Sequence, residues 1–66
     1  MNPVAIGKKL KKLRGDVAQR KVAKDINISA SALAMYETGK RIPRDEVKLR
    51  LSEYYGVSIE FLFFNN

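Results

Sequence analysis

A helical pattern that is interrupted only once, across residues 19–37, constrains the fold of this 66-residue chain more than any other feature. Val22 and Ile26 lie four residues apart, which places both on one face of a helix. Leu33 and Tyr36 resume the pattern three residues apart. Between the two pairs stands Asn-Ile-Ser, in which Asn tolerates a left-handed backbone and Ser can cap the helix that follows. The stretch therefore predicts two short helices joined at a sharp turn.

Capping residues predict where the helices begin. Asn2 and Pro3 are typical of a helix start, since Asn caps and Pro has no backbone donor to lose. Asp16, with Gln19 three residues later, is expected to form a capping box at the second start. The expected helices cover residues 3–14, 17–26, 30–37, 44–55 and 58–64. Without any strand signal, they predict a compact all-α domain of five helices over residues 1–66, in which the second and third form a helix-turn-helix.

The composition excludes several kinds of site. The chain has no cysteine and no histidine, which excludes disulfides, metal sites built on those residues and histidine acid–base chemistry. Its seven acidic residues are spread as caps and surface charges, with no nucleophile, phosphate loop or metal-ligand spacing beside them. We therefore expect no enzyme activity, no cofactor, no metal ion and no small-molecule substrate.

The sequence also bears on location. No apolar run approaches the roughly 18 residues of a membrane span, and the start of the chain lacks a signal-peptide pattern. A small domain without cysteine is compatible with a reducing cytosol. We therefore expect a cytoplasmic protein that has no membrane partner.

The charge balance favours a negatively charged partner. Thirteen lysine and arginine residues against seven acidic residues give a net charge of +6, which in a small domain favours nucleic acid or an acidic surface. Five of the cations fill the outer faces of the first expected helix: Lys8, Lys9, Lys11, Lys12 and Arg14. This basic stripe has three interpretations: a solvated face, a membrane-surface contact or a contact with the DNA backbone. The membrane interpretation is the weakest, because the stripe lacks aromatic residues.

Four motifs together point to a known family. They are LKKLRG from Leu10, the glutamine Gln19 at the second helix, YETGKRIP from Tyr36 and YYGVSIEFLF from Tyr54. With them the sequence resembles the lambda-repressor-like helix-turn-helix of the Xre and Cro/repressor family of bacterial and phage transcriptional regulators. It departs from the family at Asn27, where Gly is usual, and at Ala18, where Ser or Thr is preferred.

The resemblance implies how the chain would contact DNA. The helix over residues 30–37 would enter the major groove, and the helix before it would lie across the backbone. The outward residues of the helix over residues 30–37 would read bases: Ala30, Ser31, Ala34 and Met35. The DNA backbone would be held by Gln19, Arg20, Lys21, Thr38, Lys40, Arg41 and Arg44. The outward residues can sense thymine methyl groups and shape but offer few hydrogen bonds. Alternatively, the two alanines only allow a close approach.

Two more expectations concern packing and assembly. By resemblance, Glu37 pairs with Arg14, and the pair has a structural role. We expect an apolar C-terminal segment to supply a dimer interface through Phe61, Phe63 and Phe64. Alternatively, two of these three residues close the core. Members of the family commonly bind as dimers, so a homodimer on a pseudo-palindromic operator in double-stranded DNA is expected.

The leading hypothesis is a sequence-specific transcriptional regulator, most often a repressor in this family. The alternative is an antirepressor or modulator that uses the same fold to bind another protein. The plain outward face of the expected third helix and the aromatic C-terminal segment both suit the alternative.

Overall fold

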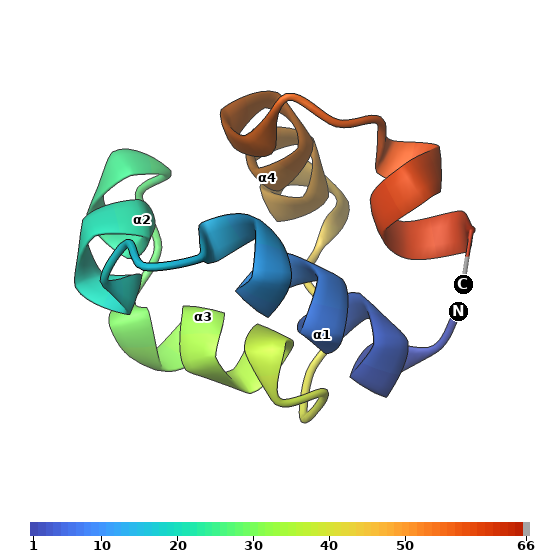
Figure 1. The fold of residues 1–66 in the computed structure, drawn as a ribbon, viewed down its shortest axis with the longest axis horizontal. Helices are drawn as coiled ribbons and strands as arrows, with labels where there is room; N and C mark the ends of the chain where they lie inside the picture. The colour runs from blue at the N-terminus through green and yellow to red at the C-terminus, as the bar shows by residue number, and fades with distance from the viewer. Residues whose placement is uncertain (66) are drawn as a thin grey trace.

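Five helices follow one another through the chain in a computed structural model that describes residues 1–65 (Figure 1). Four are α-helices and the last, η1, has π-type hydrogen bonding. Their bounds are α1 (Pro3–Arg14), α2 (Gln19–Asp25), α3 (Ala30–Glu37), α4 (Asp45–Tyr55) and η1 (Glu60–Phe64). The described residues contain no strand, which confirms the predicted all-α fold of five helices.

Side-chain caps explain the starts of the best-predicted helices. Asn2 Oδ1 accepts a hydrogen bond from the backbone N–H of Ala5 at 3.1 Å, and Pro3 begins the helix. Ser29 Oγ accepts from the N–H of Ala32 at 2.9 Å. Each cap satisfies a backbone donor that a first helical turn leaves free. Helices α1 and α3 accordingly have the bounds predicted from the sequence.

The start of α2 differs from the prediction. The helix begins at Gln19, two residues later than expected, and its N-cap residue is Ala18, which makes no side-chain cap. The predicted capping box is wrong, because the side chain of Gln19 binds Glu37 and Asp16 is not the cap. Helices α4 and η1 also begin slightly later than predicted, at residues 45 and 60. The tertiary contact of Gln19 thus replaces the local contact expected from its spacing.

The corner between α2 and α3 has the backbone predicted for it. Asn27 has φ of 59°, in the left-handed region that asparagine tolerates better than most residues. The N–H of Ile28 donates to the carbonyl of Ala23 at 2.9 Å, and that of Asn27 donates to Lys24 at 3.2 Å. These bonds close the end of α2 and turn the chain into α3.

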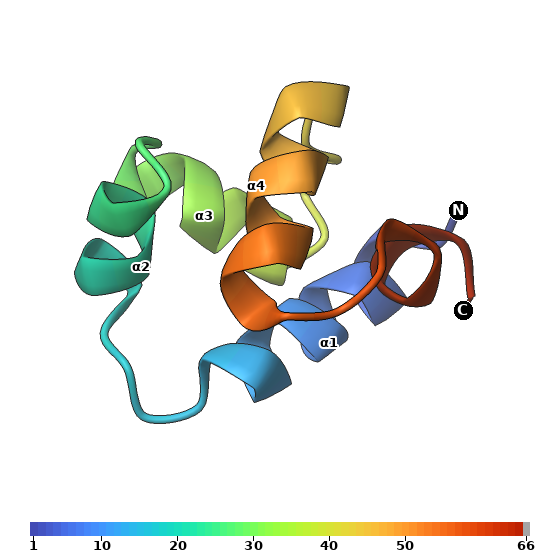
Figure 2. The same ribbon diagram turned by 90° about the horizontal axis from the view of Figure 1, so that it is seen from above.

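Helix α1 crosses α3 at a glycine. It runs between α3 on one side and α4 and η1 on the other (Figures 1 and 2). A Cβ atom on Gly7 would lie 2.8 Å from the carbonyl oxygen of Tyr36, and closer still to that of Glu37. Only glycine therefore permits this close approach of two helix backbones. The apolar core comprises Ile6, Leu10, Val22, Ala23, Ile26, Leu33, Tyr36, Val47, Leu51, Leu62 and Phe63.

The C-terminal helix η1 is fastened to α1 by a lysine. Lys9 Nζ donates to the carbonyl oxygens of Phe61 and Asn65, each at 2.6 Å. The same ammonium lies 4.5 Å from the centroid of the Phe61 ring, within the range of a cation–π contact. Lys9 thus binds η1 as well as contributing to the basic stripe of α1.

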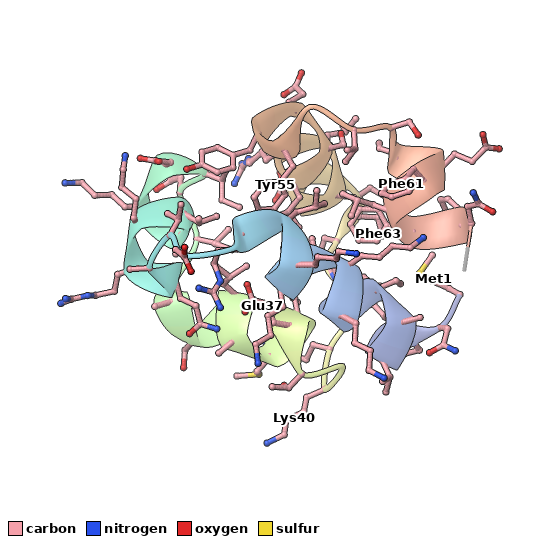
Figure 3. The ribbon with its side chains drawn as sticks, in the orientation of Figure 1. Met1, Glu37, Lys40, Tyr55, Phe61 and Phe63 are labelled. Carbon is pink, nitrogen blue, oxygen red and sulfur yellow. The ribbon has the colours of Figure 1, made fainter. Side chains whose placement is uncertain are left out.

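The predicted dimer interface is divided by the structure. Phe63 points from η1 into the protein and is fully buried, so its assignment to an exposed interface is wrong (Figure 3). Phe61 and Phe64 remain 42% and 61% exposed. Phe61 lines a hollow with residues of α1, whereas Phe64 lines another with Leu49 of α4. The three rings do not share one surface, because Phe63 is buried and Phe61 and Phe64 line different hollows.

Candidate nucleic-acid interface

The four residues predicted to read bases lie on α3 away from its buried face. Leu33 and Tyr36 are buried in the core. Ser31 is exposed, and Ala34 and Met35 are partly exposed. Ala30 is also partly exposed but packs against the core. The outward face of α3 is therefore small and mostly apolar, with the Ser31 hydroxyl as its polar group at the start of the helix.

The loop after α3 carries its cations beside this face. The backbone N–H groups of Lys40 and Arg41 donate to the carbonyl of Met35, at 2.9 and 3.4 Å, and so tie the loop to the end of α3. Both side chains are exposed, and Lys40 points away from the rest of the protein (Figure 3). Arg44 is exposed at the start of α4. Charged groups held in this way suit contacts with phosphates.

Thr38 lies between α3 and this basic loop, and its hydroxyl is engaged within the protein. The hydroxyl donates to the carbonyl of Ala34 at 2.9 Å, which uses its only hydrogen. The oxygen can then only accept, so it cannot donate to a phosphate in this rotamer. The predicted role of Thr38 in holding the backbone would require the side chain to turn.

The two cations predicted on α2 differ in their partners. Arg20 is exposed. Lys21 Nζ lies 2.9 Å from a carboxylate oxygen of Asp25, which also accepts from the hydroxyl of Tyr54 at 2.7 Å. The hydrogen bonds from Lys21 and Tyr54 lower the pKa of Asp25, and the bond with Asp25 raises the pKa of Tyr54. Lys21 thus forms an exposed ion pair, in which its ammonium uses two of three N–H donors on Asp25 and keeps one for DNA.

A buried carboxylate connects α1, α2 and α3. Glu37 Oε2 accepts from Arg14 Nε at 2.7 Å, and Oε1 accepts from Arg14 Nη2 at 3.0 Å. The Glu37 side chain is 2% exposed and that of Arg14 is 14% exposed. The predicted pair is therefore present, with the two-pronged geometry that suits arginine and carboxylate. The hydrogen bond with Glu37 raises the pKa of Arg14, although burial opposes the increase.

The same carboxylate holds Gln19, which the sequence predicted in a capping box and, by resemblance, at the DNA backbone. Gln19 Nε2 donates to Glu37 Oε1 at 2.9 Å. The amide nitrogen carries a second hydrogen, which can still donate outward. Arg14 Nη1 donates to the carbonyl of Val17 at 2.6 Å, which ties the loop before α2 to α1. The contact of Gln19 with Glu37 was not predicted, because it depends on the packing of α2 against α3.

Electrostatically, this side of the protein is positive. Glu37 is the only acidic residue between positions 30 and 44, and it is neutralised by Arg14.

Within residues 1–65, no group of His, Cys, Asp or Glu side chains could hold a metal ion. None of the helices in that range is long and apolar enough to cross a membrane.

Comparisons with known proteins agree with this geometry. A family model described as Helix-turn-helix matches residues 8–62, which include all of α2, α3 and α4. Comparisons with curated proteins and with solved structures found no match. The family match covers most of the chain and includes the corner at Asn27 and the pair of Arg14 with Glu37. The chain therefore belongs to the helix-turn-helix family of the lambda-repressor-like, Xre type.

Proposed function

We propose that this protein is a sequence-specific transcriptional regulator, acting as a repressor, that inserts α3 into the major groove of DNA. One observation supports the proposal above others: an outward face of α3 free of acidic groups lies beside the exposed cations Lys40 and Arg41. Glu37, the only acid between positions 30 and 44, is buried and paired. Such a surface can approach phosphates without electrostatic repulsion.

The proposed contacts divide into two groups. Arg20, Lys21, Lys40, Arg41 and Arg44, together with the amide of Gln19, bind the DNA backbone and supply most of the affinity. Ser31, Ala34 and Met35 face the base edges, with Ala30 at the margin of the groove. Because methyl and thioether groups recognise thymine methyls and shape, the preferred site is expected to be rich in thymine at the positions under α3.

A selection from random double-stranded DNA tests this function. The regulator is expected to enrich one motif, with half-sites about one helical turn apart, and its affinity should fall steeply with salt. Failure to enrich any motif at low salt would contradict sequence-specific regulation. We also expect the protein to act in the cytoplasm, as its resemblance to bacterial and phage regulators implies.

We also propose that the protein binds its operator as a homodimer. Phe64 and Leu49 are 61% and 52% exposed and line one hollow between α4 and η1, which makes this the apolar surface best suited to a second copy. Sedimentation of the protein with a full operator should show two copies per duplex. A single copy per duplex at high protein concentration would contradict the dimer.

A second candidate function is that of a modulator that binds another regulator. The observation that favours it is the exposure of Phe61, Phe64 and Leu49, since large exposed apolar side chains suit protein contacts. The DNA selection separates the two functions, because a modulator that acts only on protein would enrich no motif.

A further inference from the structure

A hollow at the junction of α1, α2 and α3 lies beside the proposed DNA interface. Its lining residues are Lys11, Arg14, Gln19, Glu37 and Thr38. Gln19 begins α2, and Thr38 follows α3. Both were assigned to the DNA backbone by resemblance, whereas Lys11 belongs to the basic stripe of α1, for which a DNA contact was one of three interpretations. The hollow therefore brings a cation of α1 to two positions expected to meet phosphate.

The hollow presents hydrogen-bond donors and a net positive charge. Both oxygens of Glu37 already accept hydrogen bonds from Arg14 and Gln19. Arg14 uses three of its five N–H groups in the bonds to Glu37 and Val17, and Gln19 uses one of two. Lys11 is exposed and makes no ion pair within residues 1–65. Two cations thus lie beside one carboxylate, and both oxygens of that carboxylate already accept hydrogen bonds.

We propose that this hollow binds one phosphate of the DNA backbone, with Lys11 as its principal cation. This inference rests on the proposed function and extends it, since it adds α1 to the surface that holds DNA. Arg14 and Gln19, fixed by Glu37, supply preorganised N–H donors, and Lys11 supplies a flexible ammonium. A phosphate is the anion that fits, because it accepts several hydrogen bonds at once. Its negative charge would also pair with the ammonium of Lys11, which makes no ion pair within residues 1–65.

Lys12 provides a matched control on the same helix. It is exposed like Lys11 but lines a different hollow, with Lys9, Leu13 and Phe61. Lys11→Met and Lys12→Met remove the same charge and keep a long, helix-favouring side chain. Any loss caused by the overall field of the protein is therefore equal in the two variants, and a difference between them reports a local contact.

The experiment measures the affinity of each variant for the duplex selected by the wild-type protein, as a function of salt. Lys11→Met should weaken binding about tenfold at low salt and reduce the slope of log K against log[salt] by about 1, the value for one phosphate contact. Lys12→Met should change both much less, and Lys11→Arg should retain the wild-type slope. Circular dichroism should show that all variants melt as the wild type does.

Two results would overturn the inference in distinguishable ways. Equal losses in Lys11→Met and Lys12→Met, with tight binding by the wild type, would reject the phosphate site and leave the proposed function intact. If the wild-type protein bound no DNA at low salt, both the proposed function and the phosphate site would be rejected. A methylphosphonate placed at each backbone position in turn should abolish the difference between wild type and Lys11→Met at one position only.

Discussion

Glu37 connects three helices at their junction. Its carboxylate accepts hydrogen bonds from Arg14 of α1 and Gln19 of α2, while its own backbone lies against Gly7. Removing one partner of a buried ion pair leaves a charge without compensation in a poorly solvated place. The pair therefore stabilises the arrangement of the helices that present the DNA-binding residues.

Replacing Glu37 by alanine should destabilise the protein severely. The expected loss is about 3–5 kcal/mol of unfolding free energy, because the Arg14 guanidinium would remain largely buried without its carboxylate. A chain of this size has only about 3–10 kcal/mol in total. Thermal denaturation followed by circular dichroism measures the change, with the exposed acid Glu53→Ala as the control. An unchanged melting temperature in Glu37→Ala would show that the pair has no structural role.

Tyr55 carries a buried hydroxyl that has no hydrogen-bond partner among the described residues. Burial raises the pKa of Tyr55 to about 12 from its ordinary value of 10, and the nearby charge of Glu37 adds to the increase. The unfolded chain therefore loses this proton at a lower pH than the folded protein. The neutral form stabilises the fold fully below pH 10, and that stabilisation is lost as the pH rises through 10 towards 12.

Tyr55→Phe should accordingly remove part of the alkaline loss of stability. The free energy of unfolding of the variant should fall less steeply than that of the wild type between pH 10 and 12. At pH 7 the variant should be at least as stable, because it no longer buries an unsatisfied hydroxyl. Urea denaturation across this pH range makes the comparison. A variant clearly less stable at pH 7 would show that the hydroxyl has a stabilising partner.

At the scale of elements, the crossing of α1 and α3 sets the position of the recognition helix. The two backbones approach closely at Gly7, where any Cβ would meet carbonyl groups of Tyr36 and Glu37. These atoms belong to backbone, so a larger residue must push the helices apart. Because α3 carries both the outward face and the basic loop, its displacement would also disturb the proposed interface.

Gly7→Ala should therefore be destabilising although alanine is the better helix former. Overpacking of this kind costs typically about 1–3 kcal/mol, against a gain in helix propensity of about 1 kcal/mol. The melting temperature should fall, whereas Lys8→Ala at the adjacent exposed position should leave it nearly unchanged. A melting temperature for Gly7→Ala at or above the wild-type value would contradict the close crossing.

The predictability of these elements from sequence depends on whether their determinants are local. Asn2, Ser29 and the corner at Asn27 act within a few residues, so the bounds of α1 and α3 could be predicted. The start of α2 could not, because Gln19 binds Glu37 on another helix. The need for glycine at position 7 likewise depends on a distant helix.

The C-terminal segment shows the same limit for apolar residues. Four consecutive apolar residues, 61–64, occupy little more than one helical turn, and periodicity alone cannot say which of them face the core. The structure buries Leu62 and Phe63 and leaves Phe61 and Phe64 exposed. The choice is made by the way η1 packs on α1, where Lys9 binds the carbonyl oxygens of Phe61 and Asn65.

At the scale of the whole molecule, the basic loop after α3 and the exposed aromatic residues of η1 belong to different parts of the surface. The residues of α3 and its loop include one acid, which is buried, and several exposed cations. Phe61 and Phe64 lie on η1, and Figure 3 shows Phe61 well apart from Lys40 of the basic loop. This separation allows DNA binding and contact with a second copy at the same time.

Two substitutions should separate affinity from specificity on this surface. Arg41→Ala should weaken binding to all DNA sequences about equally and lower the salt slope by about 1, since it removes a phosphate contact. Met35→Ala should instead change the preference at particular bases with little effect on non-specific binding. Repeating the DNA selection with each variant makes the comparison. A shifted motif for Arg41→Ala with an unchanged motif for Met35→Ala would contradict these roles.

The most direct test of the central claim is nuclear magnetic resonance of the protein titrated with a duplex that carries one half-site of its selected motif. The account predicts that the largest amide shifts occur in α3 and its loop, at Ser31, Ala34, Met35, Lys40 and Arg41. Amides of η1 should shift little at a single half-site, where no second copy is bound. Large shifts confined to η1 and α4, with those of α3 unchanged, would contradict the placement of α3 in the DNA groove.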